Sequence, residues 1–348
     1  MLEEIYEQPA AIGRTLKNEE ENVERISNEF DLLQPHAIWV VGSGSSYYCG
    51  RIFSYIYEFL TKKRAVPSHS SEFAGDRKRI ATKDDVVFVL SQSGETKDAI
   101  QATRAAGGIT IAVTNTKGST ITELTDYALL SHAGEERSIP STKTFTSMLA
   151  VLTLFAVDQS KSRLKDELLE LPPLLEQTMR ECEDKTKSIA KHFVRKDIVD
   201  IVGGGINYPV ALEGALKLKE VAHMHAQGLP LGEYPHGHIS LVEKGYPVIL
   251  TCVGNEGKDP TIKLMSRLSS MRAYVPTISF DLQQSVELQQ GAELQQGIDG
   301  TPLLTLPRIR QIFSPFLSVP IFQLIAYHSA VEKGLNPDKP KGLHKVVE

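Results

Sequence analysis

A short polar loop, Ser91-Gln92-Ser93-Gly94-Glu95-Thr96, has the side chains of an anion-binding site. It follows the apolar segment 86–90 and precedes a helical pattern that begins at Lys97. Its hydroxyl and amide groups would lie beside the N–H groups at the start of that helix, where the helix dipole favours negative charge. A phosphate group would fit there. The same side chains could instead only cap the helix, and the loop alone leaves both interpretations open.

Three charged residues farther along the chain could move a proton. Glu213, Lys217 and Glu220 are spaced four and three residues apart in an amphipathic helical pattern, so they fall near one side of the helix. A carboxylate beside a lysine suits proton transfer on and off carbon, the step that turns an aldose into a ketose through an enediol. The alternative is a ladder of surface salt bridges worth about 0.3–0.5 kcal/mol, which the spacing alone favours.

A loop rich in glycine and proline, 232–238, carries His236, whose imidazole we expect to be exposed and able to shuttle a proton to a sugar ring oxygen. His236 and His238 form one His-x-His pair, and His223 and His225 form another, a spacing also found among metal ligands. Helical residues two apart diverge, and no carboxylate set completes a site. We therefore expect no metal, and we expect His223 and His225 to be packing residues.

The elements that would position these groups form a repeat. An apolar strand, a glycine-rich turn and a long helix occur at 37–60 and again at 197–223. Gly203 follows Gly42 at the same spacing as Pro247 follows Val86. Apolar strands that alternate with helices are typical of parallel sheets covered on both faces, which bind ligands beyond the carboxyl ends of the strands. The sequence therefore predicts two duplicated α/β domains.

We expect a helical N-terminal arm at 1–30, a first domain at 31–165, a helical connection at 166–192, a second domain at 193–335 and a docking tail at 336–348. Further strands are expected at 110–113, 128–130 and 275–278, and helices at 144–158 and 320–332. The prolines of the tail exclude a continuous helix there. A Leu-Gln-Gln tract at 282–296 is interpreted as a polar surface excursion without chemistry.

Length and composition restrict the class of protein. A chain of 348 residues with 41% hydrophobic and 23% charged residues is typical of a two-domain globular protein. A net charge of -5 argues against a nucleic-acid or membrane-surface partner. No apolar run of about 18 residues and no signal peptide are recognised. Three widely spaced cysteines suggest neither a disulfide framework nor a zinc ribbon, so a cytoplasmic location is expected.

The Gly42-Ser43-Gly44 turn could also belong to a dinucleotide site, because it follows a strand and precedes a helix. The full fingerprint fails, since Tyr47 stands where a third glycine or an alanine is needed for close helix packing. A nicotinamide cofactor is therefore not expected.

Taken together, the motifs resemble those of the sugar isomerase (SIS) family. The resemblance rests on the 91–96 loop, Pro-Ser-Thr-Lys-Thr-Phe-Thr at 140–146, Ala-Leu-Glu-Gly-Ala-Leu-Lys-Leu-Lys-Glu at 211–220, His236-Gly237 and the tail around Lys345, in that order over nearly the whole chain. The motifs are most similar to the isomerase half of glucosamine-6-phosphate synthase and to its stand-alone deaminase relatives. This resemblance implies two tandem doubly wound parallel-sheet domains of the flavodoxin-like type.

The resemblance also implies a substrate site without a cofactor. The residues that would hold the sugar phosphate are Ser91, Gln92, Ser93 and Thr96, and those that would line the sugar are Ser45, Ser46 and Ser141.

Four further residues match catalytic positions of the family. Glu220 would move the proton between C1 and C2, with Lys217 beside it. His236, often supplied by the partner subunit of a homodimer, would open the sugar ring, and Lys345 would form an imine with the open-chain ketose.

The expected activity is the interconversion of glucosamine 6-phosphate with fructose 6-phosphate and ammonia. Three alternatives stay open: a synthase that uses ammonia from a separate protein, a fructosamine-6-phosphate deglycase, and a phosphosugar sensor without activity. The presence of Glu220, His236 and Lys345 argues against the sensor. Because the chain begins with Met1 and not with a cysteine-led glutaminase domain, glutamine hydrolysis is not expected.

Two departures from the family pattern leave the loop geometry and the amine specificity open. His238 stands where the synthase loop usually has proline, and Gln227 stands where it has glutamate. Neither departure removes a catalytic group.

Overall fold

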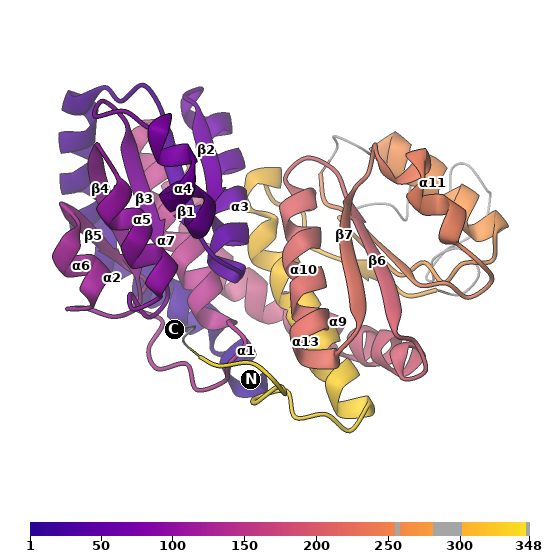
Figure 1. Ribbon diagram of the computed structural model, residues 1–348. Helices are drawn as coiled ribbons and strands as arrows, with labels where there is room; N and C mark the ends of the chain where they lie inside the picture. The colour runs from indigo at the N-terminus through magenta and orange to yellow at the C-terminus, as the bar shows by residue number, and fades with distance from the viewer. Residues whose placement is uncertain (255–257, 281–300, 346–348) are drawn as a thin grey trace. The chain divides into compact units, whose positions relative to one another are not determined.

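The computed structural model describes residues 1–254, 258–280 and 301–345, so the Leu-Gln-Gln tract at 282–296 lies outside the described residues (Figure 1). The chain divides into two compact units. The first unit comprises residues 3–173 together with the tail from Gly342, and the second comprises residues 1–2 and 174–341. The tail around Lys345 therefore belongs to the same unit as residues 3–173.

The first unit contains a parallel sheet of five strands in the order β2-β1-β3-β4-β5. Its strands are β1 (Ile38–Gly42), β2 (Ala65–His69), β3 (Val86–Leu90), β4 (Ile109–Thr114) and β5 (Tyr127–Leu130). Every residue of β1 and β3 is buried, as their continuous apolar sequences predict for a sheet covered on both faces. The strand order is that of a flavodoxin-like doubly wound fold.

Helices cover both faces of this sheet. They are α1 (Leu2–Tyr6), α2 (Gln8–Leu33), α3 (Ser45–Thr61), α4 (Ser70–Gly75), η1 (Arg77–Arg79), α5 (Lys97–Ala105), α6 (Thr120–Leu124), α7 (Lys143–Gln159) and α8 (Lys165–Leu169). Phe88 packs against Phe30, Phe53 and Phe155 of α2, α3 and α7. Its neighbour Val87 joins the core under α4, α5 and α6, because successive strand residues point to opposite faces.

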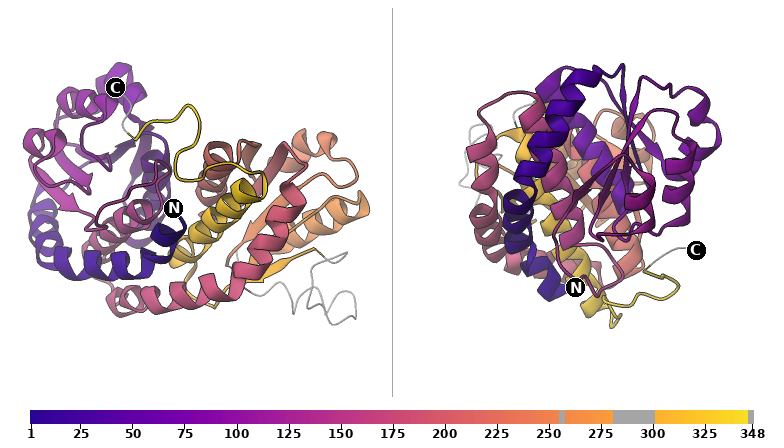
Figure 2. Two further views of the ribbon diagram at one scale, coloured as in Figure 1. Left: turned by 90° about the horizontal axis from the view of Figure 1, so that it is seen from below. Right: turned by 90° about the vertical axis from the view of Figure 1, so that its left-hand side faces the viewer.

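The N-terminal arm is part of the core of the first unit. Helix α2, the long indigo helix in Figure 2, packs along α7. Its buried Ser27 accepts a hydrogen bond from the Gln159 amide, and its Thr15 hydroxyl bonds to the carbonyl of Ser131. The arm thus fixes the segment that follows β5.

The second unit repeats the topology of the first. Its parallel strands β6 (Ile198–Gly203), β7 (His225–Pro230), β8 (Val248–Cys252), β9 (Thr277–Ser279) and β10 (Leu303–Thr305) have the order β10-β9-β8-β6-β7. Read from the other edge, this is again second, first, third, fourth and fifth strand. The predicted duplication of an α/β doubly wound domain is confirmed.

Among its described residues, the second unit has the helices α9 (Leu171–Phe193), α10 (Asn207–Ala222), α11 (Lys258–Ser270) and α13 (Pro315–Glu332), with the short turns η2 (Tyr234–His236), η3 (His238–Leu241) and η5 (Gln311–Phe313). Helices α10 and α13 pack closely. A Cβ atom at Gly214 of α10 would come within 2.7 Å of the Phe322 ring of α13, so only glycine allows this approach. Helix α11 packs its leucines on the opposite face of the sheet.

Helix α13 differs from the sequence prediction. It begins at Pro315, five residues before the expected start, and Pro320 lies inside it. Proline at the first helical position is favourable because no N–H is needed there. By length and composition, the segment Gln311–Glu332 could cross a membrane, yet 94% of its apolar window is buried inside the protein, as in a core helix.

The edge strands β2, β7 and β10 are not among the predicted elements. β2 contains Pro67 and β7 contains Gly228, and both strands are only partly buried, so neither has the continuous apolar pattern of the central strands. The prediction that His223 and His225 pack in the core is wrong, because both are exposed. His223 ends α10 in the left-handed conformation, with φ of 51°.

Candidate functional site

The predicted phosphate loop and the first glycine turn begin side by side at the carboxyl edge of the first sheet. Gly42 of β1 is the register partner of Leu90 of β3, so the chain leaves both strands at the same level (Figure 1). The segment 43–46 then enters α3, and the segment 91–96 enters α5. A Cβ atom at Gly42 would lie 2.8 Å from the Tyr47 nitrogen, so this glycine permits the tight turn.

The Ser91 and Thr96 hydroxyls of the 91–96 loop face each other, and the Ser93 hydroxyl accepts a hydrogen bond from the Glu95 N–H. The Ser91 and Thr96 hydroxyls are 3.1 Å apart, and the Ser91 hydroxyl accepts a hydrogen bond from the Gly94 N–H. Thr96 precedes α5 in an extended conformation and makes no side-chain capping hydrogen bond. The interpretation that these residues only cap the helix therefore fails for Thr96, and an anion could take the capping position.

Gly94 gives the loop its shape. Its φ is +70°, which side chains other than glycine rarely adopt, and a Cβ atom there would lie 2.0 Å from the Ser119 hydroxyl. Glu95 turns away from the loop, and both its oxygens accept hydrogen bonds from Thr120. The Thr120 hydroxyl bond, followed by the backbone bond, lowers the pKa of the Glu95 carboxyl. Glu95 thus supports the loop and leaves its serine and threonine groups for a ligand.

Asn115 joins the phosphate loop to the segment that follows β5. Its N–H donates to the Gln92 carbonyl, and its side-chain oxygen accepts hydrogen bonds from the Ser131 hydroxyl and the Ala133 N–H. Its amide nitrogen donates to the Gly134 carbonyl. Sequence reasoning missed this residue, because a lone asparagine after a strand has no distinctive pattern.

The same segment leads to Ser141 and meets the tail. Lys345 donates hydrogen bonds to the Glu136 carboxylate and to the Ser138 carbonyl, so this predicted imine-forming residue lies in the first unit with the phosphate loop. Ser141 lies 2.7 Å from the Thr144 hydroxyl at the start of α7. Glu136 is the second residue that sequence reasoning missed.

In the second unit, the three charged side chains of α10 meet as their spacing predicts. The Lys217 ammonium lies 2.5 Å from a Glu220 oxygen and 3.5 Å from a Glu213 oxygen. The Lys217 and Glu213 side chains are fully buried, whereas 21% of the Glu220 side chain is exposed. A surface salt-bridge ladder is therefore ruled out. Lys217 fixes the Glu220 carboxylate, and the Glu220 side chain stays partly exposed.

His236 is exposed, as expected, and its loop is anchored to the sheet by a buried tyrosine. Two residues earlier, Tyr234 is fully buried, and its hydroxyl donates a 2.9 Å hydrogen bond to Asp200 of β6. Burial raises the pKa of the Asp200 carboxyl, and the Tyr234 bond opposes this increase. His238 stacks on the Tyr234 ring, with 6.1 Å between the ring centroids.

We expect Tyr234→Phe to lower the free energy of unfolding by about 1–3 kcal/mol, because the buried Asp200 loses the hydrogen bond from the Tyr234 hydroxyl. Urea denaturation measures this change, and hydrogen exchange over 232–238 reports on the loop. Tyr55→Phe, at an exposed tyrosine, is the matched control and should change stability by less than about 0.5 kcal/mol. Equal stability of the two variants would show that the Asp200 contact does not anchor the loop.

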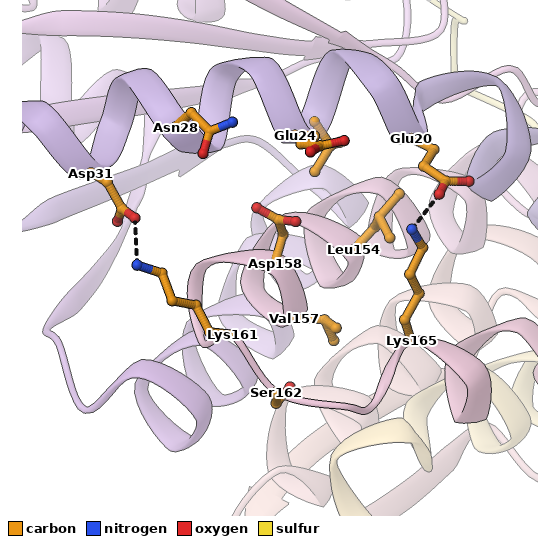
Figure 3. Close-up of a pocket in the computed structure, with 11 residues that line it drawn as sticks. Glu20, Glu24, Asn28, Asp31, Leu154, Val157, Asp158, Lys161, Ser162 and Lys165 are labelled. Atoms are coloured by element: carbon orange, nitrogen blue, oxygen red, sulfur yellow. Dashed lines mark hydrogen bonds and ion pairs between the residues drawn. The ribbon is translucent and has the colours of Figure 1, made fainter.

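A separate cavity of about 410 Å³ in the first unit has the wrong charge for a phosphate. It lies beside α2 and α7 and is lined by Glu20, Val23, Glu24, Asn28, Asp31, Leu154, Val157, Asp158, Lys161, Ser162 and Lys165 (Figure 3). Its two lysines are already paired with Asp31 and Glu20, while Glu24 and Asp158 add further negative charge. None of the predicted site residues lines it. Within residues 1–254, 258–280 and 301–345, no group of three or more metal-ligating side chains gathers.

Comparison with known proteins agrees with this architecture. The SIS domain family model matches residues 31–158 and 192–299. The isomerizing glutamine–fructose-6-phosphate aminotransferase of Thermococcus kodakarensis is 33% identical over 360 residues, covering 100% of this chain and 57% of that relative. The chain thus spans little more than half the length of the curated relatives it matches.

Two solved structures are similar over nearly their whole length. The C-terminal domain of glucosamine-fructose-6-phosphate aminotransferase from Francisella tularensis has a TM-score of 0.88 and 26% identity, covering 98% of this chain and 97% of that one. Glucosamine-6-phosphate deaminase from Thermotoga maritima has a TM-score of 0.79 and 23% identity, covering 99% and 98%, which shows a shared fold. The chain belongs to the SIS domain family.

Proposed function

We propose that the chain is a phosphosugar aldose–ketose isomerase and deaminase that interconverts glucosamine 6-phosphate with fructose 6-phosphate and ammonia. The observation that carries this proposal is the buried Lys217, which holds a partly exposed Glu220 carboxylate ready to exchange a proton. The names of the two aminotransferase relatives above include fructose 6-phosphate, and one of them also includes glucosamine. Glu220 is proposed to shift the proton between C1 and C2.

The phosphate is proposed to bind in the first unit. Its ligands would be Ser91, Gln92, Ser93 and Thr96, with the N–H groups of the first turn of α5, and Ser45, Ser46 and Ser141 would line the sugar. The uncapped start of α5 supports this assignment, because a dianion there is stabilised by both the N–H groups and the helix dipole.

Two catalytic groups complete the proposed reaction. His236, exposed on its loop, would pass a proton to the ring oxygen and open the sugar. Lys345 would then form an imine with the open-chain ketose, which makes the neighbouring C–H more acidic. The reaction needs no metal or other cofactor.

An ammonia-dependent synthase is the second candidate. It is favoured by the match to the isomerizing aminotransferases, of which this chain covers 57%. Ammonia would then come from a separate protein. A fructosamine-6-phosphate deglycase would use the same groups to release an amino acid.

One assay separates these activities. The purified chain is incubated with glucosamine 6-phosphate, galactosamine 6-phosphate or fructosyl-amino-acid 6-phosphates, and ammonia, amino acid and ketose phosphate are measured. Ammonia and fructose 6-phosphate from glucosamine 6-phosphate would support the deaminase. Faster synthesis from fructose 6-phosphate and ammonium would favour the synthase, and no turnover of any substrate would refute the proposal.

We also propose a homodimer in which His236 of one subunit serves the site of the other. Mixing His236→Ala with Glu220→Gln subunits should then restore about a quarter of wild-type activity, because each mixed dimer regains one complete site. The mixture is unfolded and refolded together, and activity is compared with that of each variant alone. Equal inactivity of the mixture and the separate variants would contradict a shared site.

A cytoplasmic location is part of the proposal. Cys49, Cys182 and Cys252 are all free and buried, which suits a reducing compartment. Fractionation of cells that express the chain would test this.

A further inference from the structure

The ammonium of the tail residue Lys345 contacts the carboxylate of Glu136, which is not among the predicted site residues. Lys345 places its ammonium 3.4 Å from Glu136 and 2.5 Å from the carbonyl of Ser138. These residues are 209 and 207 positions away in sequence but lie in the same compact unit. Its side chain remains 30% exposed, so the amine is held without being closed off.

Glu136 is built into the start of α7. Its side chain is fully buried, and one oxygen accepts hydrogen bonds from the N–H and hydroxyl of Thr142 and from the N–H of Thr144. Its other oxygen accepts from the Thr144 hydroxyl at 2.5 Å. A buried carboxylate is costly unless it is hydrogen-bonded, and these four bonds together with the positive end of the α7 dipole keep it in place.

The oxygen that meets Lys345 also leads to the predicted sugar site. Thr144 donates to this oxygen, and the Thr144 hydroxyl is 2.7 Å from the hydroxyl of Ser141. The carboxylate thus connects a group proposed to line the sugar with the amine proposed to attack it. The backbone that follows Glu136 is held by Glu4 of α1, which accepts hydrogen bonds from the N–H groups of Arg137 and Ser138.

We propose that Glu136 is the positioning residue for Lys345: it holds the tail amine beside the phosphosugar site and takes the proton that the ammonium must lose before it can attack. The inference rests on the proposed imine chemistry. The neutral amine forms a bond to the carbonyl carbon of the open-chain ketose, and one proton passes from the attacking nitrogen to the former carbonyl oxygen, which gives the carbinolamine. The protonated Glu136 then returns its proton to that hydroxyl, which leaves as water while the nitrogen lone pair forms the C=N bond. In sum, an ammonium and a carbonyl become a protonated imine and water, and the carboxylate is regenerated.

Reductive trapping tests this role directly. The folded chain is incubated with fructose 6-phosphate and cyanoborohydride, and mass spectrometry follows the modification of Lys345. We expect Glu136→Gln to slow trapping at saturating sugar at least tenfold, while the sugar concentration for half-maximal rate changes less than threefold. The amide keeps the oxygen acceptor for the Thr142 and Thr144 groups but cannot hold a cation or accept the proton.

Glu135→Gln is the matched control. It removes the same charge one residue away, where the side chain is 75% exposed and pairs only with Arg137 among the contacts shown. We expect it to trap within twofold of wild type. Wild-type trapping by Glu136→Gln, or an equal loss in Glu135→Gln, would overturn the inference.

A second comparison remains valid if Glu136→Gln does not fold. Lys345→Arg keeps a cation for Glu136, whereas Lys345→Ala leaves the buried carboxylate without one. We expect the melting temperature of the alanine variant to be at least about 2 °C lower than that of the arginine variant. Equal melting temperatures would overturn the inference. Absence of trapping in wild type would instead refute the proposed function, because trapping requires the imine. The melting comparison does not depend on sugar chemistry, so it tests the contact between Lys345 and Glu136 separately.

Discussion

Replacing Glu220 by glutamine should lower turnover by about 10²- to 10⁴-fold while phosphosugar binding stays within about threefold of wild type. Glutamine has nearly the same shape and keeps an oxygen for the buried Lys217, but it cannot accept a proton from carbon. The proposed phosphate ligands lie in the other compact unit and are not altered. Binding and chemistry should therefore separate in this variant.

The measurement combines a coupled assay for fructose 6-phosphate with calorimetric binding of sorbitol 6-phosphate, an open-chain analogue that cannot isomerise. Exchange of the C2 hydrogen of glucosamine 6-phosphate with deuterated water reports the proton step alone. Glu176→Gln on α9, at an exposed i,i+4 pair with Arg180, is the control and should leave both quantities unchanged. Joint loss of turnover and binding in a folded Glu220→Gln protein would contradict the assigned role.

Gly94→Ala should weaken binding of the phosphate by about 10- to 150-fold, with a much smaller effect on the chemical step. The new Cβ would lie 2.0 Å from the Ser119 hydroxyl and 2.4 Å from its Cβ, and alanine at φ of +70° is strained. The loop must therefore move and lose one or more hydrogen bonds to a charged ligand, each worth about 1.5–3 kcal/mol. Affinity for inorganic phosphate and KM for glucosamine 6-phosphate measure the effect.

A second substitution separates the clash from the backbone strain. Gly94→Ala combined with Ser119→Gly removes the two nearest atoms that the new methyl group meets and leaves Ile121 Cγ1 at 3.2 Å, so affinity should return in part. Ser119 is suited to this test because its buried hydroxyl has no hydrogen-bond partner among the described residues. Gly107→Ala, where a Cβ meets nothing within 4 Å, should bind as wild type. Unchanged phosphate affinity in Gly94→Ala would place the phosphate elsewhere.

The central strands and long helices could be predicted from sequence because their patterns are continuous. β1 and β3 are apolar at every position and buried on both faces, and the glycine turns that follow them repeat in the second unit. The edge strands β2 and β7 could not be predicted, because both are only partly buried and contain polar residues. In addition, Pro67 interrupts the apolar pattern of β2, and Gly228 interrupts that of β7. Their place in the sheet depends on pairing with β1 and β6, which a local pattern does not reveal.

In the candidate site, too, local contacts could be predicted from the sequence and long-range contacts could not. Glu213, Lys217 and Glu220 meet because helical spacing is a local property, and sequence predicts local properties well. Glu136 and Asn115 escaped notice because their roles come from contacts with Lys345 and Gln92, far away in the chain. We predict that the phosphate loop and Glu220 act on the same hexose, and the binding and exchange experiments above address this prediction.

The return of the tail to the first unit means that the two halves of the gene are not interchangeable modules. A fragment that stops at Pro173 would contain the phosphate loop and Glu136 but no amine to place beside them. Attempts to exchange halves between family members would separate Lys345 from the carboxylate with which it is matched.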